Sequence, residues 1–279
     1  MRPVLLMVSI ALAGLAAVAQ DKPAARAQYG LAVFKLGERF ATDDKAGESI
    51  DALCMWLGKQ VEGAAFVRRG VRNKPGDALK VLQSADKAVA VAIVSPGFYF
   101  KHKAALKLTA LAEARRGGND GEEYVLLGLN AAQKYPSGAK VATSMTADPD
   151  WLKAALPAPK DAKPIEWVQR DNLFDAAWAI VDGDKGAPAF VLVDRVTRKA
   201  VEADAELKVL KAGLKSENLP QDLVVEVDGR LGEKRAALKR ALRELDQSEE
   251  GKKLGTNLQT ATFPAPDEKR LERVAKLYE

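Results

Sequence analysis

The sequence has 279 residues with 43 Lys or Arg and 38 Asp or Glu, which gives a formal net charge of +5. The basic residues are scattered among acidic ones, without an arginine-rich arm or a basic run with interleaved aromatics, and this argues against a nucleic-acid-binding protein. One cysteine, Cys54, excludes an internal disulfide, and one histidine, His102, excludes a zinc site built on several histidines.

The N-terminal stretch MRPVLLMVSIALAGLAAVAQ has the pattern of a secretory leader. Arg2 supplies a positive charge before an apolar run, and the small residues Ala17 and Ala19 form an A-x-A cleavage pattern. The apolar run has about 15 residues, short of the roughly 20 that a bilayer span needs. We therefore expect residues 1–19 to be a cleaved signal peptide and the mature protein to be periplasmic, with a membrane anchor as the alternative.

Strand and helix patterns alternate in the next part of the chain. Apolar runs and helical periodicity predict a strand over 29–37, a helix over 45–61, a strand over 63–71, a helix over 75–86 and a strand over 88–94. The last strand, AVAVAIV, is apolar on successive residues, as in a parallel sheet covered on both faces. This succession indicates an α/β layer architecture.

Two residues in the predicted helices have specific expected roles. Cys54 lies on an apolar stripe with Leu53 and Leu57, so we expect a buried thiol rather than a reactive nucleophile. Ile50, Met55 and Trp56 extend the apolar stripe of the same helix. Asp77 is the expected N-cap of the second helix.

The run VAVAIVSPGFYFKHK, residues 89–103, ends a buried strand at Ser95-Pro96-Gly97. In open parallel sheets, ligands bind beyond the carboxyl ends of strands. Serine before proline is also a good start for a helix, and the free amides of a helix start favour an anion. Ser95 is therefore either a ligand contact or a plain helix cap. Tyr99 offers a ligand a hydroxyl or an aromatic wall, or it packs in the core.

The second half repeats the same theme. The patterns predict strands over 106–115 and 122–130, a strand, hydroxyl-rich turn and helix over 140–156, a strand over 165–170, a helix over 171–184 capped by Asp171 and closed by Gly183, a strand over 187–195, two strands within 207–232 and a helical end.

Several stretches carry a resemblance to a known family. They are VAIVSPGFYFKHKAALKLTALAEARR (91–116), EEYVLLG (122–128), KVATSMTADPDWL (140–152) and the tail 207–254, in which Ser216, Leu219-Pro220, Leu245, Ser248 and Glu250-Gly251-Lys252 stand in the order of the family pattern. On these residues the chain resembles the type 2 periplasmic solute-binding proteins, and among them the phosphate/phosphonate-binding proteins of ABC transporters.

The resemblance implies an α/β fold of two lobes, each a βαβ sheet layered by helices, joined by a two-strand hinge around 128–137 and 213–221. Lobe one would comprise 20–132 and 216–279, and lobe two 133–215. It also implies a monomeric, non-catalytic protein without cofactor or metal. Such a protein captures a small ligand, expected to be a phosphate- or phosphonate-like oxyanion, between the lobes and delivers it to an ABC permease.

The strand ends facing the cleft would supply the ligand contacts. These are Ser95 and Tyr99 from lobe one and Thr143, Ser144, Thr146 and Asp194 from lobe two. The three lobe-two hydroxyls would make a neutral anion pocket, although they also suit ordinary capping. Asp194 would accept from a ligand hydroxyl or amine, or pair with Arg195 or Arg198.

Asp148 and Asp150 follow the hydroxyl-rich turn of lobe two. Two carboxylates close to an anion would repel it. Either they face away as N-cap groups, or the ligand is not a dianion.

Two other classes of function stay open. One is an orphan ligand-binding or sensory module of the same fold that contacts a signalling partner instead of a permease. The other is an enzyme on this fold. The sequence has no glycine-rich nucleotide loop, no GxSxG elbow and no plausible nucleophile–base pair, which argues against the enzyme.

Overall fold

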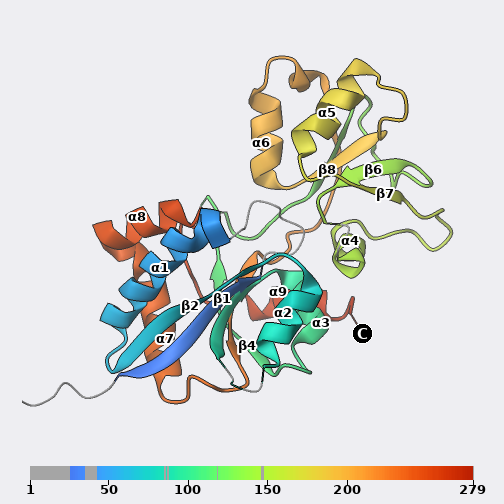
Figure 1. The fold of residues 1–279 in the computed structure, drawn as a ribbon. Helices are drawn as coiled ribbons and strands as arrows, with labels where there is room; N and C mark the ends of the chain where they lie inside the picture. Colours follow the sequence, from blue (N-terminus) through green and yellow to red (C-terminus); the bar gives the residue numbers. More distant parts are fainter. Residues whose placement is uncertain are drawn as a thin grey trace, which may run out of the picture.

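The structure, a computed structural model, describes residues 26–34, 43–84, 86, 88–117, 119–145 and 148–278. The predicted signal peptide, the end of the first predicted strand and Thr146 lie outside these residues. Two five-stranded sheets with flanking helices form two lobes (Figure 1), which confirms the predicted two-lobed α/β class. Within the described ranges, no helix combines the length and apolarity that a bilayer crossing requires.

The sheet of lobe one has the strand order β2-β1-β3-β10-β4. Its strands are β1 (Ala27–Phe34), β2 (Ala64–Arg72), β3 (Val89–Val94), β4 (Leu108–Ala114) and β10 (Asp222–Val227). β1 runs parallel to β2 and β3, and β10 lies antiparallel between β3 and β4. All six residues of β3 are buried, as expected for a strand covered on both faces.

Helices cover both faces of this sheet. They are α1 (Asp43–Gln60), α7 (Lys234–Arg243) and α8 (Glu249–Asn257) on one face, and α2 (Pro75–Leu82), α3 (Pro96–His102) and α9 (Glu268–Ala275) on the other. Cys54 lies in the first of these cores, where burial and the nearby Asp51 raise the pKa of its thiol to about 12. The thiol therefore stays protonated near neutral pH. Met55 is 65% exposed, so its predicted place on the apolar stripe is wrong.

The sheet of lobe two has the strand order β7-β6-β8-β5-β9. Its strands are β5 (Val125–Gly128), β6 (Lys140–Thr143), β7 (Glu166–Gln169), β8 (Phe190–Val193) and β9 (Lys211–Lys215). β6 is parallel to β7 and β8, whereas β5 is antiparallel to β8 and β9. The helices of this lobe are α4 (Pro149–Ala155), α5 (Leu173–Asp182) and α6 (Arg195–Ala203).

The chain crosses between the sheets twice, after β4 and after β9. The crossing segments pair through an isolated bridge, in which Glu122 N donates to Leu219 O (2.7 Å) and Leu219 N donates to Glu122 O (2.8 Å). This is the two-strand hinge. The first crossing lies between β4 and β5, before the predicted 128–137. Residues 125–132, predicted in lobe one, belong with lobe two, because β5 pairs with β8 and β9. The apolar pattern of β5 suits either sheet, and only pairing assigns it.

Two predicted helix caps are wrong by one or more residues. α2 begins at Pro75 with Lys74 in the N-cap position, so Asp77 lies inside the first turn. α5 is capped by Asn172, whose side chain accepts from Phe174 N (3.1 Å), and not by Asp171. α2 starts at Pro75 because the fixed φ of proline suits the first turn of a helix. Asn and Asp cap helices about equally well, so residue type alone does not choose Asn172 over Asp171.

Candidate functional site

The hinge fixes which edge of each sheet faces the other lobe. β10 leaves the hinge antiparallel to β3, with Leu223 opposite Val94, and β5 leaves it antiparallel to β8, with Val125 opposite Val193. The carboxyl ends of β3 and β8 therefore lie at the hinge side of their sheets. The predicted contact residues that follow these strands are Ser95 and Asp194, and Thr143 ends β6, which is parallel to β8.

Ser95 occupies the N-cap position of α3 with an extended backbone, but its side chain makes no cap hydrogen bond. Its backbone N–H donates to Phe34 O (3.3 Å). Its Oγ is buried and has no hydrogen-bond partner among the described residues. A buried hydroxyl without a partner costs about 1–3 kcal/mol, so this position calls for a further polar group.

The hydroxyl-rich turn of lobe two begins at the end of β6. Thr143 is fully buried, and its Oγ1 accepts from Met145 N (3.3 Å). The carbonyl of Ser144 accepts from Gln169 Nε2 (3.2 Å). The first contact closes the turn, and the second ties it to the end of β7, so both residues lie at the edge of the lobe-two sheet.

The other two predicted contacts have structural partners. Tyr99 packs edge-on to Phe100 (5.3 Å between ring centroids) and lines a pocket of about 330 Å³ against α9. Burial raises the pKa of the Tyr99 hydroxyl, and the negative charge of Glu268 raises it further. Asp194 caps α6, accepting from Thr197 N at 2.7 Å, while Arg198 pairs with Glu202 at 2.7 Å.

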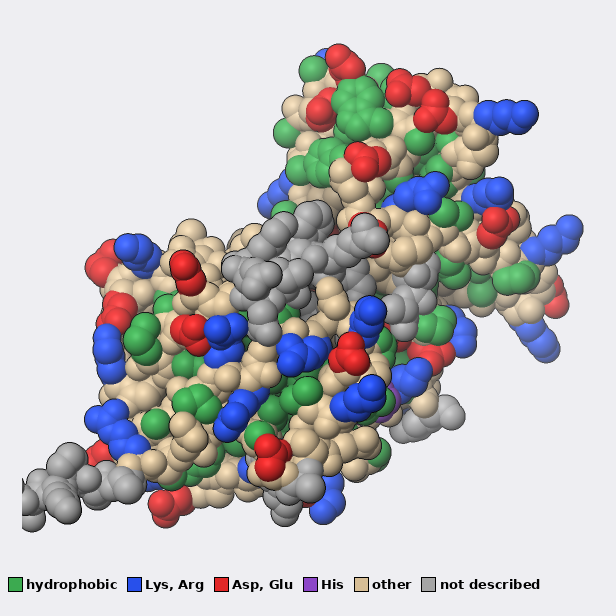
Figure 2. Space-filling model, in the orientation of Figure 1, with side chains coloured by type: hydrophobic (Ala, Val, Ile, Leu, Met, Phe, Trp, Pro, Cys, Tyr) green, Lys and Arg blue, Asp and Glu red, His purple; other side chains and the backbone are tan. Residues whose placement is uncertain are grey.

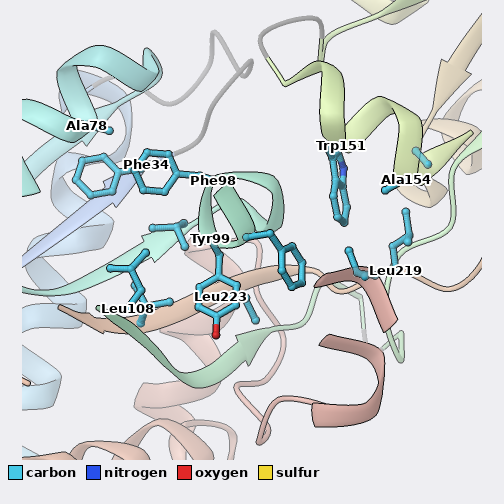
Figure 3. Close-up of a cluster of buried hydrophobic side chains, with 14 of the residues drawn as sticks. Phe34, Ala78, Phe98, Tyr99, Leu108, Trp151, Ala154, Leu219 and Leu223 are labelled. Carbon is cyan, nitrogen blue, oxygen red and sulfur yellow. The ribbon is translucent and has the colours of Figure 1, made fainter. Parts of the chain in front are cut away.

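α4 brings lobe two onto α3 of lobe one (Figure 3). Asp148 caps α4 by accepting from Trp151 N (3.1 Å), and Trp151 Nε1 donates to the hydroxyl of Tyr124 (3.3 Å). The Asp148 carboxylate also reaches lobe one. A Cβ on Gly97 would lie 2.6 Å from Asp148 Cγ and would overlap its Oδ2. Asp150 instead pairs with Lys153 (3.0 Å).

Asp148 thus meets only half of the first predicted alternative. It is an N-cap group, yet it does not face away from the other lobe. Burial raises the pKa of the Asp148 carboxyl, against the smaller effects of its cap hydrogen bond and of Lys101. A buried carboxylate lies at the hinge, where Glu122 Oε1 accepts from Glu123 N and Arg195 N, both at 3.0 Å. Burial likewise raises the pKa of Glu122.

A third feature, which the sequence did not reveal, is an ion cluster of α9 at the hinge. Arg270 is only 4% exposed and donates to Asp120 O (3.0 Å), and it lies 3.4 Å from Glu113 Oε2. Gly121 has a φ of 92°, and an added Cβ would collide with the Arg270 guanidinium. Glycine here lets the guanidinium lie flat on the crossing segment.

Charged groups elsewhere are mixed rather than segregated. Figure 2 shows Lys and Arg side chains scattered among Asp and Glu side chains over both lobes on that face. In the part of the chain that the structure describes, no group of three or more His, Cys, Asp or Glu residues could hold a metal ion.

No family profile and no curated protein matches the sequence. Solved structures do. XAC2383 from Xanthomonas citri bound to chloride ion superimposes with a TM-score of 0.69 at 11% identity, over 90% of this chain and 96% of that one. PhnD1 from Prochlorococcus marinus in complex with methylphosphonate superimposes with a TM-score of 0.62 at 10% identity, over 89% of this chain and 96% of that one.

The binding protein component of an ABC phosphonate transporter from Pseudomonas aeruginosa gives a TM-score of 0.61 at 13% identity, over 91% of this chain and 86% of that one. Identities this low establish the fold and not the ligand. The chain has the fold of the type 2 periplasmic solute-binding proteins, with phosphonate-binding proteins among its structural neighbours.

Proposed function

We propose that this chain is an exported solute-binding protein that captures a small oxyanion of the phosphate or phosphonate type between its lobes and delivers it to an ABC permease. The observation that carries the proposal is the buried, unpartnered hydroxyl of Ser95 at the carboxyl end of β3. A ligand oxygen would accept from this hydroxyl. Thr143 and Ser144 lie at the carboxyl end of β6, on the hinge side of the lobe-two sheet, and would supply the lobe-two contacts of the ligand pocket.

The fold supports the capture step. The crossing segments 115–124 and 216–221 would bend as the hinge, and the ligand would bind the closed form better and shift the open–closed balance toward it. The neighbours that bind phosphonate have this fold, and the leader-like N-terminus supports export. Three further contacts are proposed with less support from the structure. Asp194 caps a helix, Tyr99 lies against α9, and Thr146 is outside the described residues.

A thermal-shift panel of inorganic phosphate, phosphonates, sulfonates and small organic cations tests the ligand class. Ligand at about 100 times its dissociation constant adds about 2.7 kcal/mol to the free energy of unfolding, which raises Tm by roughly 5–10 °C. We expect phosphate or a phosphonate to produce this shift. A rise in Tm with the cations alone would contradict the proposal that the ligand is an oxyanion.

Ser95→Ala separates a ligand contact from a helix cap. Because Oγ is buried and makes no hydrogen bond in the described residues, its removal should not destabilise the protein and should raise the free energy of unfolding by up to about 1–3 kcal/mol. Oxyanion affinity measured by calorimetry should fall about tenfold or more, since a hydrogen bond to a charged group contributes about 1.5–3 kcal/mol.

Ser248→Ala is the matched control for Ser95→Ala. Ser248 Oγ accepts from Gly251 N (3.0 Å) and caps α8, so its loss should destabilise the protein by about 1 kcal/mol and leave oxyanion affinity unchanged. If Ser95→Ala behaves like this control, Ser95 is a structural residue and the proposal loses its main support.

The partner distinguishes transport from a sensory role on the same fold. Loss of this protein should abolish uptake of labelled methylphosphonate by cells if it serves a permease. Normal uptake together with a lost transcriptional response to the compound would favour the sensory module.

A further inference from the structure

At one point of contact between the two lobes, a carboxylate lies directly against a glycine. Asp148 comes from lobe two and Gly97 from lobe one. Any side chain at Gly97 would overlap Asp148 Oδ2 and lie 2.6 Å from its Cγ. The backbone of Gly97 has no positive φ, so the space taken by Asp148, and not the local backbone, requires a glycine.

The groups around Asp148 only partly balance its charge. Lys101 on α3 stabilises the ionised carboxyl, whereas Asp150 on α4 destabilises it. Tyr278, near the C-terminus, stacks on Phe100 with 5.4 Å between ring centroids. Its hydroxyl is buried without a hydrogen-bond partner among the described residues, and burial, followed by the charges of Asp148 and Asp150, raises its pKa. The contact therefore places a carboxylate in a half-buried position, with one exposed lysine to offset its charge.

Separation of the lobes would return Asp148 to water. On the lobe-one side, Asp148 lies against Gly97 of α3, and its charge acts on the hydroxyl of Tyr278. Its cap hydrogen bond to Trp151 N is within lobe two and would remain. In the structure, where α4 lies against α3, burial is the largest influence and raises the pKa of Asp148. We call this arrangement of the lobes closed. By linkage, the arrangement with the higher pKa gains stability when the group is protonated.

We propose that Asp148 is a charge gate of the cleft: closing the lobes buries its carboxylate against Gly97, so closure favours the protonated side chain and opposes an anionic ligand until that carboxylate is neutralised or displaced. The first part concerns the ligand-free protein and needs no ligand. The second part rests on the proposed function and makes Asp148 a residue that sets the charge of the solutes that are accepted.

The sign of the pH dependence follows from the raised pKa. The stability that protonation adds to the closed arrangement is fully present below the ordinary Asp pKa of about 3.9 in the open form. It is lost as the pH rises through the higher pKa of the closed form. The ligand-free protein should therefore be more closed in mild acid than at neutral pH.

Small-angle X-ray scattering of the ligand-free mature protein between pH 4.5 and 8 measures this balance. The wild type should have a smaller radius of gyration at the acid end. Asp148→Asn keeps a good N-cap residue for α4 and removes the charge, so it should be compact across the whole range. Asp150→Asn, one turn away and paired with Lys153, should follow the wild type.

Glu122→Gln tests whether the hinge carboxylate, rather than Asp148, causes the pH dependence, because burial also raises the pKa of Glu122. It should keep the pH dependence of the wild type. A radius of gyration that does not change with pH in the wild type, or a wild-type pH response in Asp148→Asn, would overturn the gate.

Calorimetry with inorganic phosphate and methylphosphonate tests the second part. Asp148→Asn should bind at least about tenfold more tightly than the wild type, because it removes a like charge from a poorly hydrated contact. If neither protein binds either compound but scattering behaves as expected, the proposed ligand fails and the gate stands. If both bind equally and scattering is insensitive to pH, the gate fails and the proposed function stands.

Discussion

Arg270→Met is expected to lower the free energy of unfolding by about 3–5 kcal/mol and Tm by roughly 10 °C, because it leaves a buried carboxylate without its main partner. Glu113 is 1% exposed, and its Oε1 accepts from Gln221 N (2.8 Å) while Oε2 lies 3.4 Å from Arg270. The remaining cation, Arg115, is more distant, at 3.8 Å. Chemical denaturation followed by circular dichroism measures the change.

Arg273→Ala on the same helix is the matched control. Its side chain is 51% exposed, where it donates to Asn218 O (2.6 Å) and pairs with Glu217 (3.2 Å). Exposed pairs contribute about 0–1 kcal/mol, so the loss should be small. Arg270→Met combined with Glu113→Gln should recover part of the stability, since it removes the unpaired buried charge. Equal effects of the two arginine variants would show that Arg270 does not secure the hinge.

Gly97→Ala is expected to keep the fold intact but to hold the lobes apart. The new methyl group would overlap Asp148 Oδ2, so either that carboxylate gives up its cap of α4 or α4 retreats from α3. We expect a larger radius of gyration and a loss of oxyanion affinity of at least about tenfold, comparable to the 1–3 kcal/mol that overpacking costs. X-ray scattering and calorimetry give the two readouts.

Gly76→Ala controls for the substitution itself. Gly76 also follows a proline in the first turn of a helix, α2, but nothing lies within 4 Å of an added Cβ. This variant should scatter like the wild type. In Gly97→Ala, the further change Asp148→Ala removes the overlapping carboxylate and should restore the compact form. A compact Gly97→Ala single variant with unchanged affinity would contradict the tight contact between the lobes.

The sequence patterns predict the strands well because each βαβ unit buries an apolar run between helices. β3 and β8 illustrate this, with buried residues at nearly every position. The hinge was misplaced because the run at β5 is apolar enough for either sheet, and non-local pairing decides. α6, which Asp194 caps, was not predicted because its residues are mostly charged or polar and Val201 is its one buried residue, so the apolar stripe of a helix is weak.

The candidate site could be predicted only in part. The position of Ser95 at a strand end follows from the sequence, but its lack of a hydrogen-bond partner depends on packing. The contact of Asp148 with Gly97 depends on how the lobes meet, which no local pattern encodes. Arg270 and Arg273 stand three residues apart with similar neighbours, and only the tertiary structure buries one and exposes the other.

A crystal structure of the mature protein grown with methylphosphonate tests most directly whether the lobes capture a ligand between them. The account predicts that the phosphonate lies within hydrogen-bond distance of Ser95 Oγ and of at least one group of lobe two, at or next to Thr143 and Ser144. A phosphonate bound to one lobe alone, or in the pocket between α3 and α9, would contradict it.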